Sequence, residues 1–594
     1  MIRKPLRPLA SILKARDAGE NPDVIERENI RQRHEEMRDK ARSRAEGRLF
    51  IMAILFLGGF ITVGARMGIV TYSEAVEPRT NYSANRIVAQ RADIVDRQGR
   101  LLATNLETSS LYAQPPHMID KERVVKELVE IFPDLDEERL IKDFTGKRKF
   151  VWIRKKLSPE QKQAVHDIGD PGLQFGDREM RLYPNGKLAA HVLGGASFGK
   201  EDVHAAEVIG VAGVEKQFDD ALRDPSNGGK ALTLSLDLTV QAAAERVLYG
   251  GMKLLNAKGA SSVLMDVHTG EIISIVSLPD FDPNDRPRPP TQGHAADSPL
   301  FNRAIQGLYE LGSTFKIFTA AQAMELGLAN PETLIKTAGP LRWGKFKIRD
   351  FRNYGSQLTL TKIIVKSSNI GTARMAQVIG AKRQQGFLRD LGFFEPTPVE
   401  VVEARGAQPM LPKNWSELST MTISYGHGIS ASPLHLAAGY AAIANGGKRV
   451  LPTLLKRDTP QDGPRVMSEA SAAQARRMLR LVVTEGTASF GDVPGYAVGG
   501  KTGTADKPKE NGGGYYEDKV IATFASMFPA HDPKYVLIVA LDEPVETSGP
   551  EPRRTAGWTA VPVAAEMIAR VAPLLGLRPD VEPGALPDIT LTSN

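Results

Sequence analysis

The chain has 594 residues, more than one hydrophobic core usually holds, so two or more domains are expected. With 42% hydrophobic residues, the chain is too apolar for a disordered or fibrous protein. It has no cysteine, which excludes disulfides, thiolate catalysis and cysteine-bearing zinc sites, and its ten histidines show no HExxH-type spacing, so we expect no metal and no cofactor. The net charge of +6 is compatible with nucleic-acid binding, but part of the excess lies in the first 48 residues, ahead of an apolar stretch, which favours a membrane and no nucleic-acid partner.

The apolar stretch is LFIMAILFLGGFITVGARMGIV, residues 49–70, which is long enough to cross a bilayer and carries one charge, Arg66, near its end. A cleaved signal peptide and a buried core helix are the alternatives. The long polar segment before it and the absence of a small-residue cleavage site after it favour an uncleaved anchor. Arginines on its left flank place residues 1–48, a basic tail, in the cytoplasm and the remainder of the chain outside.

Residues 71–230 are expected to form an irregular α/β module that follows the anchor. The segment ADIVDRQGRLLATN (92–105) predicts a β-hairpin, because two short apolar strands flank a turn-forming Asp-Arg-Gln-Gly. Helical periodicity follows at 121–131 and 136–144. In the first of these helices, four apolar residues share one face: Val124, Val125, Leu128 and Ile131.

Residues 231–577 are expected to form a second domain of the α+β class. A predicted helix from Leu238 leads to two apolar strands in 261–279, another hairpin is predicted in 520–544, and a helix closes the domain. Because strands stand at both ends and helical patterns lie between them, we expect one antiparallel sheet that joins the two ends of the domain. Residues 578–594 have the composition of a tail.

A serine and a lysine three positions apart occur in three places: Ser11 with Lys14, Ser197 with Lys200, and Ser313 with Lys316. The first pair lies on the cytoplasmic side of the anchor. Glycines around the second pair disfavour the helix that would bring its side chains together. The third pair, in YELGSTFK (309–316), follows a glycine and precedes an apolar run, as expected at the start of a helix.

The third pair has the spacing of a nucleophile beside its base. On a helix, residues three apart lie on one face, so Lys316 can reach Ser313. A serine hydroxyl needs an adjacent base, and a lysine serves as one only when burial or another cation lowers its pKa. The rest of the sequence must therefore supply a second cation near this pair.

Two further short motifs supply the remaining groups. The segment VKSSNIGTA contains Ser367 and Asn369, for which the alternative role is that of a helix N-cap. The segment AVGGKTGTA contains Lys501, Thr502 and Gly503, and a strand entering a turn with a solvated lysine is the alternative there. Each motif alone is weak, whereas their order S-x-x-K, S-x-N, K-T-G within one domain and on one side of the membrane is specific.

These motifs resemble those of the penicillin-binding, serine-active D,D-transpeptidase family, and the resemblance is nearly continuous from about residue 86 to about residue 575. RADIVDRQGRLLA resembles the pedestal signature of class B members, with Ala92 where a glycine is usual, and GVAGVEKQFDDAL resembles another pedestal element. Leu311 stands where a proline commonly precedes the Gly-Ser of the first motif. With one module before the transpeptidase domain and none like a glycosyltransferase, the chain resembles a monofunctional, class B member, most closely the division-specific FtsI-like type.

The resemblance implies a fold and a mechanism. The fold is a membrane-anchored pedestal followed by a transpeptidase domain whose antiparallel sheet has helices on both sides. Ser313 attacks the D-Ala-D-Ala carbonyl of a peptidoglycan stem peptide, and Lys316 is its base, with its charged form disfavoured by the nearby Lys501. Ser367 relays a proton to the leaving amine, and Asn369 orients Lys316 and the substrate. The residues implied for the substrate carboxylate and the extended peptide are Lys501, Thr502, Gly503 and Thr504, with the backbone N–H groups of Ser313 and Thr504 as the oxyanion hole.

The remaining implications concern neighbouring residues, partners and location. Glycines at 499, 500 and 503 are expected to keep a strand edge open for the peptide, and His427 and His435 are interpreted as structural. The resemblance implies β-lactam binding, a single-pass protein of the bacterial inner membrane at the division septum, a polytopic SEDS-type glycan polymerase as partner, and other divisome proteins. An elongation-type transpeptidase, a β-lactamase and a catalytically silent divisome scaffold are the alternatives.

Overall fold

The computed structural model describes residues 9–72, 91–201, 206–509 and 512–580. The chain divides into two compact units, Met1–Ile87 and Val88–Asn594. The first unit contains helix α1, Leu9–Asp17, and helix α2, Pro22–Tyr72. The first residues of the basic tail, the start of the pedestal at 73–90 and most of the predicted C-terminal tail lie outside the described residues.

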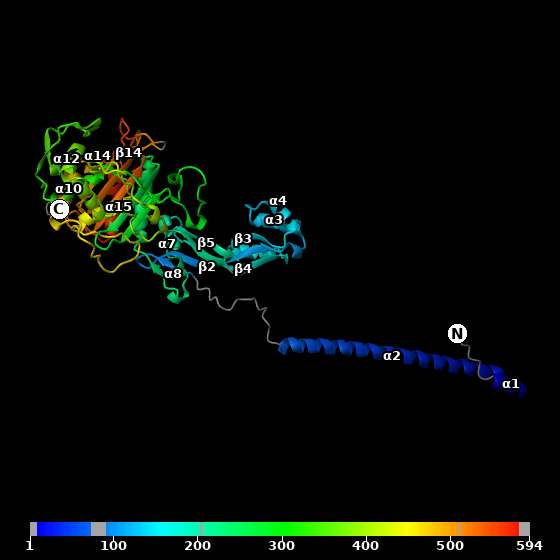
Figure 1. The fold of residues 1–594 in the computed structure, drawn as a ribbon. Helices are drawn as coiled ribbons and strands as arrows, with labels where there is room; N and C mark the ends of the chain where they lie inside the picture. Colours follow the sequence, from blue (N-terminus) through cyan, green and yellow to red (C-terminus); the bar gives the residue numbers. More distant parts are fainter. Residues whose placement is uncertain (1–8, 73–90, 202–205, 510–511, 581–594) are drawn as a thin grey trace, which may run out of the picture. The chain divides into compact units, whose positions relative to one another are not determined.

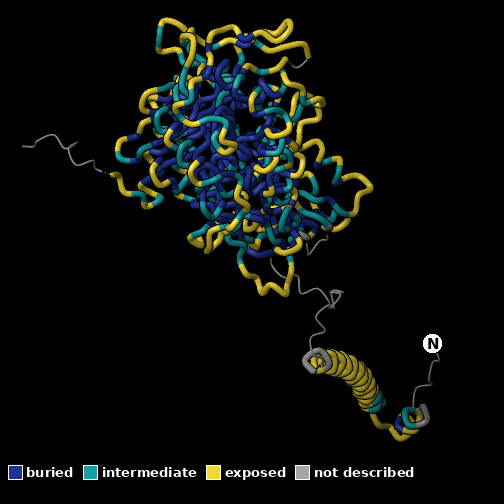
Figure 2. The backbone as a smooth tube through the Cα atoms, turned by 60° about the vertical axis from the view of Figure 1, so that its left-hand side comes forward, coloured by how far each residue is buried: buried dark blue, intermediate teal, exposed yellow. Residues whose placement is uncertain are grey.

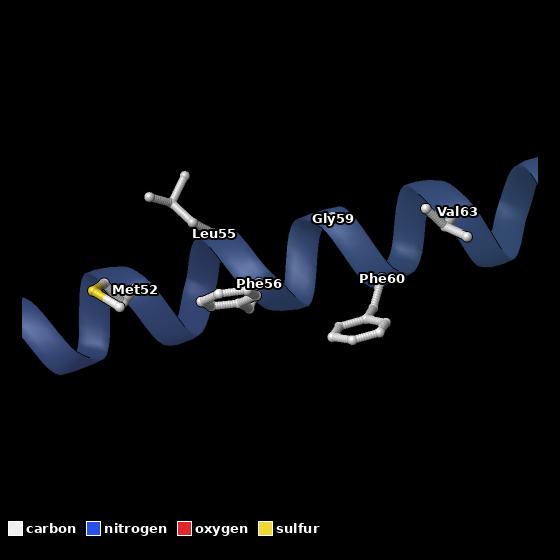
Figure 3. Close-up of a pocket in the computed structure, with 6 residues that line it drawn as sticks. All are labelled: Met52, Leu55, Phe56, Gly59, Phe60 and Val63. Atoms are coloured by element: carbon white, nitrogen blue, oxygen red, sulfur yellow. The ribbon is translucent and has the colours of Figure 1, made fainter.

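Helix α2 carries the predicted anchor in its second half. Figure 2 shows α2 exposed along its length, and Figure 3 shows apolar side chains projecting from the segment between Met52 and Val63. Among the described residues, this is the one helix that is long and apolar enough to cross a bilayer. Exposed leucine, phenylalanine and isoleucine side chains are stable in lipid and not in water, so the helix fits a single-pass membrane anchor.

The pedestal is built on a five-stranded sheet (Figure 1). The predicted hairpin is confirmed, because β1, Ile94–Val95, pairs antiparallel with β2, Leu101–Ala113. Two further strands, β3, Val151–Leu157, and β4, Leu173–Leu182, both pair with β2. Strand β7, Leu232–Thr233, pairs with β1 in parallel, so the pedestal sheet includes residues just past the predicted boundary at 230.

Three helices pack on the part of this sheet formed by β2, β3 and β4: α3, Lys121–Ile131, α4, Glu137–Thr145, and α5, Pro159–Asp167. Helices α3 and α4 begin at the N-caps Asp120 and Asp136, each of which accepts a backbone N–H three residues on. The predicted face of α3 is confirmed, because its valines and Leu128 are buried in a small core that is separate from the main one. The near part of the pedestal holds β5, Gly195–Glu201, β6, Ala206–Ala212, α6, Ala190–Leu193, α7, Gly213–Gln217, and α8, Asp219–Arg223.

The second domain, which follows the pedestal in Figure 1, is built on a five-stranded antiparallel sheet. Its strand order is β14-β15-β16-β8-β9. Strands β8, Gly259–Asp266, and β9, Ile272–Leu278, form the first predicted hairpin, and β15, Tyr515–Phe528, and β16, Tyr535–Asp542, form the second. Strand β16 pairs with β8, so the sheet joins the two ends of the domain as predicted. Strand β14, Gly499–Pro508, is an edge strand and carries the K-T-G motif.

Helices cover both faces of this sheet. Helices α9, Leu238–Leu254, and α17, Ala560–Leu574, pack against each other and against one face. Helices α10, Lys316–Glu325, α15, Pro433–Ala444, and α16, Glu469–Glu485, cover the other face. Helices α11, Leu360–Lys366, α12, Asn369–Ile379, α13, Ala381–Asp390, and α14, Glu417–Ile423, complete this side. The serine, asparagine and lysine motifs therefore lie on neighbouring elements.

Candidate active site

Ser313 lies in a short 3₁₀ turn, η5, Gly312–Phe315, that continues into α10. Ser313 is half-buried, whereas the three residues after it are buried, so Ser313 is the part of this turn that reaches the surface. Gly312 has a φ of +57°, and a Cβ atom there would lie 3.0 Å from the carbonyl oxygen of Thr504. A glycine is therefore needed at 312 both for the backbone conformation and for the close approach of β14.

Lys316 is completely buried, and its side-chain nitrogen donates two hydrogen bonds to Ser367. Its Nζ lies 2.5 Å from the Ser367 carbonyl oxygen and 3.0 Å from Ser367 Oγ. The sequence predicts that Lys316 reaches Ser313, but among the described residues its hydrogen bonds go to Ser367 instead. The spacing places Ser313 and Lys316 on the same turn. The packing of α11 against this turn determines that the amine contacts the hydroxyl of Ser367 and not that of Ser313.

Ser367 ends helix α11 in the left-handed conformation, with a φ of +61°. This conformation is uncommon for residues other than glycine and asparagine, and strained backbone of this kind clusters at functional sites. The N-cap that the sequence offered as an alternative role belongs to the next residue, Ser368, which accepts the backbone N–H of Gly371. Ser367 is therefore the C-cap of α11 and not the N-cap of α12, and its side chain contacts the two lysines.

Lys501 approaches Ser367 from the other side. Its Nζ donates to Ser367 Oγ at 3.0 Å and to the carbonyl oxygen of Thr502 at 3.0 Å, so one hydroxyl oxygen accepts from two lysines. Burial lowers the pKa of Lys501 to about 7. The pKa of Lys316 is lowered well below its usual value, first by burial and then by the charge of Lys501, against a smaller opposing effect of Asp350. The second cation that the serine–lysine pair requires is therefore Lys501.

The depressed pKa of Lys501 predicts a pH-dependent stability. An unfolded lysine titrates at about pH 10.4, so between about pH 7 and that value the unfolded chain binds a proton that native Lys501 does not. The free energy of unfolding should then rise with pH in this window, by up to about 1.4 kcal/mol per pH unit. Relative to a Lys501→Met form, the urea midpoint of the wild type is expected to rise between pH 7 and pH 9. Parallel midpoints of the two proteins across that range would contradict it.

The three residues after Lys501 have different surroundings. The Oγ1 atoms of Thr502 and Thr487 lie 2.7 Å apart, and Thr504 Oγ1 accepts the backbone N–H of Ala556. A Cβ atom at Gly503 would collide with the Leu311 carbonyl under η5.

The three glycines of β14 are explained by packing inside the protein rather than by an incoming peptide, contrary to the expectation from the sequence. At 499 a Cβ atom would press against α16 and Ala530, and at 500 it would lie 2.7 Å from the carbonyl oxygen of Ala525. Together with Gly503, these positions let β14 lie close to its neighbours. The edge position of β14 still leaves the strand able to pair with an extended peptide.

Asn369 is the first residue of α12, and its side chain is held by the segment before it. Its Nδ2 donates to the Arg349 carbonyl oxygen at 3.0 Å. Asp350, which the sequence did not single out, accepts from Ser368 Oγ at 2.7 Å and from the backbone N–H of Ile370 at 3.0 Å. Among the described residues, the side-chain hydrogen bond of Asn369 goes to Arg349 and not to Lys316, so its orienting role stays a prediction.

The sequence also carries no signal for Glu310, a carboxylate that lies between the side chains of His427 and Tyr515. Glu310 lies three residues before Ser313 and accepts from the Gly428 backbone N–H at 2.8 Å and from the Tyr515 hydroxyl at 3.1 Å, and His427 Nδ1 lies 3.0 Å from it. Through Glu310, His427 is linked to the segment that carries Ser313. No motif spacing links residues 310, 427 and 515, which come together through the fold alone.

His435 has the structural role that the sequence suggested. It forms a capping box with Ser432 at the start of α15, and burial lowers its pKa to about 4. Among the residues the structure describes, no cluster of three or more His, Asp or Glu side chains is arranged to hold a metal ion.

Two family models match the chain. The model of the penicillin binding protein transpeptidase domain matches residues 260–568, and that of the penicillin-binding protein dimerisation domain matches residues 86–235. The first match includes all three motifs, which lie on η5 and the start of α10, at the junction of α11 and α12, and on β14. The second includes the pedestal sheet.

Curated relatives and a solved structure cover most of the chain. The probable peptidoglycan D,D-transpeptidase FtsI of Caulobacter vibrioides is 34% identical over 562 residues, with 92% of each chain covered. The peptidoglycan D,D-transpeptidase FtsI of Escherichia coli is 26% identical over 526 residues, covering 83% of this chain and 85% of the relative. The crystal structure of penicillin binding protein 3 from Mycobacterium tuberculosis, complexed with aztreonam, matches with a TM-score of 0.61 and 26% identity over 83% of this chain and 98% of that one.

Proposed function

The chain belongs to the class B penicillin-binding proteins, a family of peptidoglycan D,D-transpeptidases of which its relatives are FtsI-like members, and on this premise we propose that it cross-links septal peptidoglycan through an acyl-enzyme on Ser313. The observation that carries the proposal is the contact of Ser367 Oγ with both Lys316 and Lys501. The remaining steps follow from the hydrogen bonds of these three residues.

The contacts of Lys316 suit a base. A neutral lysine amine has two N–H groups and one lone pair. Both N–H groups are used by the oxygens of Ser367, so the lone pair is the one position left for the proton of Ser313. Because burial and Lys501 lower its pKa, Lys316 can be neutral at the pH of the cell envelope. The Ser313 alkoxide then attacks the carbonyl between the two terminal D-alanines.

Ser367 suits a proton relay to the departing amine. Its hydroxyl oxygen accepts from two lysines, which directs its own proton away from both of them. That proton can pass to the nitrogen of the leaving D-alanine, and Ser367 recovers a proton from Lys316. The bond between the two D-alanines breaks, the acyl group stays on Ser313 and free D-alanine leaves.

The backbone of Ser313 and Thr504 suits the oxyanion. The first N–H groups of a helical turn have no acceptor within the turn, and Ser313 occupies such a position in η5. The backbone of Thr504 lies against Gly312, so donors from the turn and from β14 come together. Protonated Lys501, with Thr502 and Thr504, would hold the carboxylate of the terminal D-alanine or of a β-lactam.

The second half of the reaction distinguishes a transpeptidase from a β-lactamase. The amine of a second stem peptide attacks the acyl-enzyme, forms the cross-link and restores Ser313. A β-lactamase needs a base that activates water at this stage. Glu310 is the carboxylate nearest to Ser313 in sequence, and it is engaged by Tyr515 and Gly428 rather than held ready for water. The contacts therefore favour the transpeptidase.

The setting of this chemistry is proposed from the anchor and the relatives. Residues 1–48 would lie in the cytoplasm and the catalytic domain in the periplasm, because arginines flank the apolar stretch on its left side. The FtsI names of the relatives support a role in division, with a polytopic SEDS-type glycan polymerase and other divisome proteins as partners.

Depletion of the protein tests the septal role. Cells that lose septal cross-linking but keep lateral wall growth are expected to form filaments without septa, scored by microscopy with a fluorescent D-amino acid. Rounded or bulging cells would instead favour the elongation-type alternative. Complementation with Ser313→Ala at the normal protein level should leave the filaments, and restored division would favour the catalytically silent scaffold.

A further inference from the structure

The segment just before the second motif forms an exposed, strongly basic hairpin. Strands β11, Leu341–Trp343, and β12, Phe346–Ile348, pair antiparallel across a tight turn, and the chain then runs on to Arg352. We call residues 341–352 the basic hairpin. It holds one carboxylate, Asp350, and five cations: Arg342, Lys345, Lys347, Arg349 and Arg352.

The base of the basic hairpin is fixed to the catalytic domain. Leu341 and Ile348 lie opposite each other and are buried in a small apolar cluster with Ile370, Ala373 and Met421, which belong to α12 and α14. This cluster is separate from the main core of the domain. The hairpin is therefore held in place at its base while its tip projects.

The facing charges of the basic hairpin do not stabilise its fold. Arg342 and Lys347 face each other across the two strands, and like charges in this arrangement destabilise a hairpin. All five cations are exposed, and none forms an ion pair with another residue that the structure describes. Three large aromatic side chains accompany them, with exposed fractions of 39% at Trp343, 51% at Phe346 and 83% at Phe351. Exposed aromatic and cationic groups together mark a binding surface.

The basic hairpin is bonded directly to the active site. The carbonyl oxygen of Arg349 accepts the side-chain N–H of Asn369, and Asp350 accepts from Ser368 and from the start of α12. Its one carboxylate is thereby used internally, which leaves the projecting surface purely cationic. The hairpin is therefore bonded directly to the segment that carries Ser367 and Asn369.

We propose that the basic hairpin docks the polymeric substrate, a glycan strand that carries anionic stem peptides. Sugar rings pack on aromatic faces, and the free carboxylates of the stem peptides complement the five cations. This inference rests on the proposed function and deepens it, because it says where the strand lies when a stem peptide enters the site. A fluorescent penicillin, which carries no glycan, does not need this surface.

The test compares two matched double variants of the full-length protein. The first, Arg342→Ser with Lys347→Ser, removes the facing cations of the basic hairpin. The second, Arg246→Ser with Lys253→Ser, removes one arginine and one lysine from the exposed side of α9, on the opposite face of the sheet. Binding of fluorescent, uncross-linked glycan strands with intact stem peptides is measured by fluorescence anisotropy, and penicillin acylation reports on the integrity of each active site.

The hairpin variant is expected to bind the strands about tenfold more weakly at low salt, with the difference shrinking as salt rises, and the α9 variant to bind as the wild type does. Strands stripped of their stem peptides should bind the wild type and the hairpin variant alike. Equal binding of intact strands by both double variants would overturn the proposal. The same measurement with vesicles of anionic lipid in place of strands gives the other contrary result: a hairpin variant that loses binding to the vesicles alone. Failure of wild-type penicillin labelling would count against the proposed function, whereas equal strand binding with normal labelling would count against the hairpin alone.

Discussion

Replacement of Lys316 by methionine is expected to reduce acylation by penicillin at least about 10³-fold, while Ser313 and the fold remain in place. Methionine fills a similar volume in this buried position but offers no lone pair for the proton of Ser313. The hydrogen bonds to both oxygens of Ser367 are lost as well. The measurement is the second-order acylation rate, followed by stopped-flow fluorescence.

A Lys316→Arg form separates the charge of this residue from its action as a base. Arginine keeps a cation and donors for Ser367, but it does not give up its proton in proteins. The account therefore expects Lys316→Arg to be as slow as Lys316→Met. An arginine variant that keeps a tenth or more of the wild-type rate would show that charge alone is needed.

Replacement of Ser367 by alanine is expected to slow acylation about 10²-fold, because both lysines lose their common acceptor and the leaving amine loses its proton donor. The neighbouring serine supplies the matched control. Ser368 caps α12 and bonds Asp350, so Ser368→Ala should cost about 1 kcal/mol of stability with a much smaller effect on the rate.

Acylation rates and thermal midpoints of both alanine variants distinguish these roles. The expected pattern is a slow but stable Ser367→Ala protein and a faster but less stable Ser368→Ala protein. The reverse pattern would mean that Ser367 supports the helix and Ser368 the chemistry. Equal losses of acylation rate and of thermal midpoint in the two variants would mean that the roles of Ser367 and Ser368 in catalysis and in helix capping are not separate.

The sequence predicted the elements of the site better than their contacts. Both hairpins of the sheet and its closure between the ends of the domain follow from alternating apolar strands, and the need for a second cation near Ser313 and Lys316 pointed to Lys501. These predictions rest on local periodicity and on the chemistry that a buried lysine requires, both of which a sequence carries.

The contacts depend on tertiary packing and could not be read from spacing. Lys316 bonds Ser367 rather than Ser313 because α11 ends in a left-handed residue that turns the serine toward the lysines. Glu310 and His427 meet because the Gly426 backbone lies against Gly312, a proximity that no motif records. The sequence did not identify Asp350 as a partner of Ser368, because this contact forms only when the segment before α11 folds back onto α12.

The account is tested most directly by locating the covalent bond. The full-length protein is incubated with a fluorescent penicillin at neutral pH and digested, and the labelled peptide is sequenced by mass spectrometry. The expected result is a long-lived label on Ser313, within the YELGSTFK segment, and on no other residue. A label on Ser367, or a protein that takes up no label while it remains folded, would contradict the proposal that Ser313 is the nucleophile.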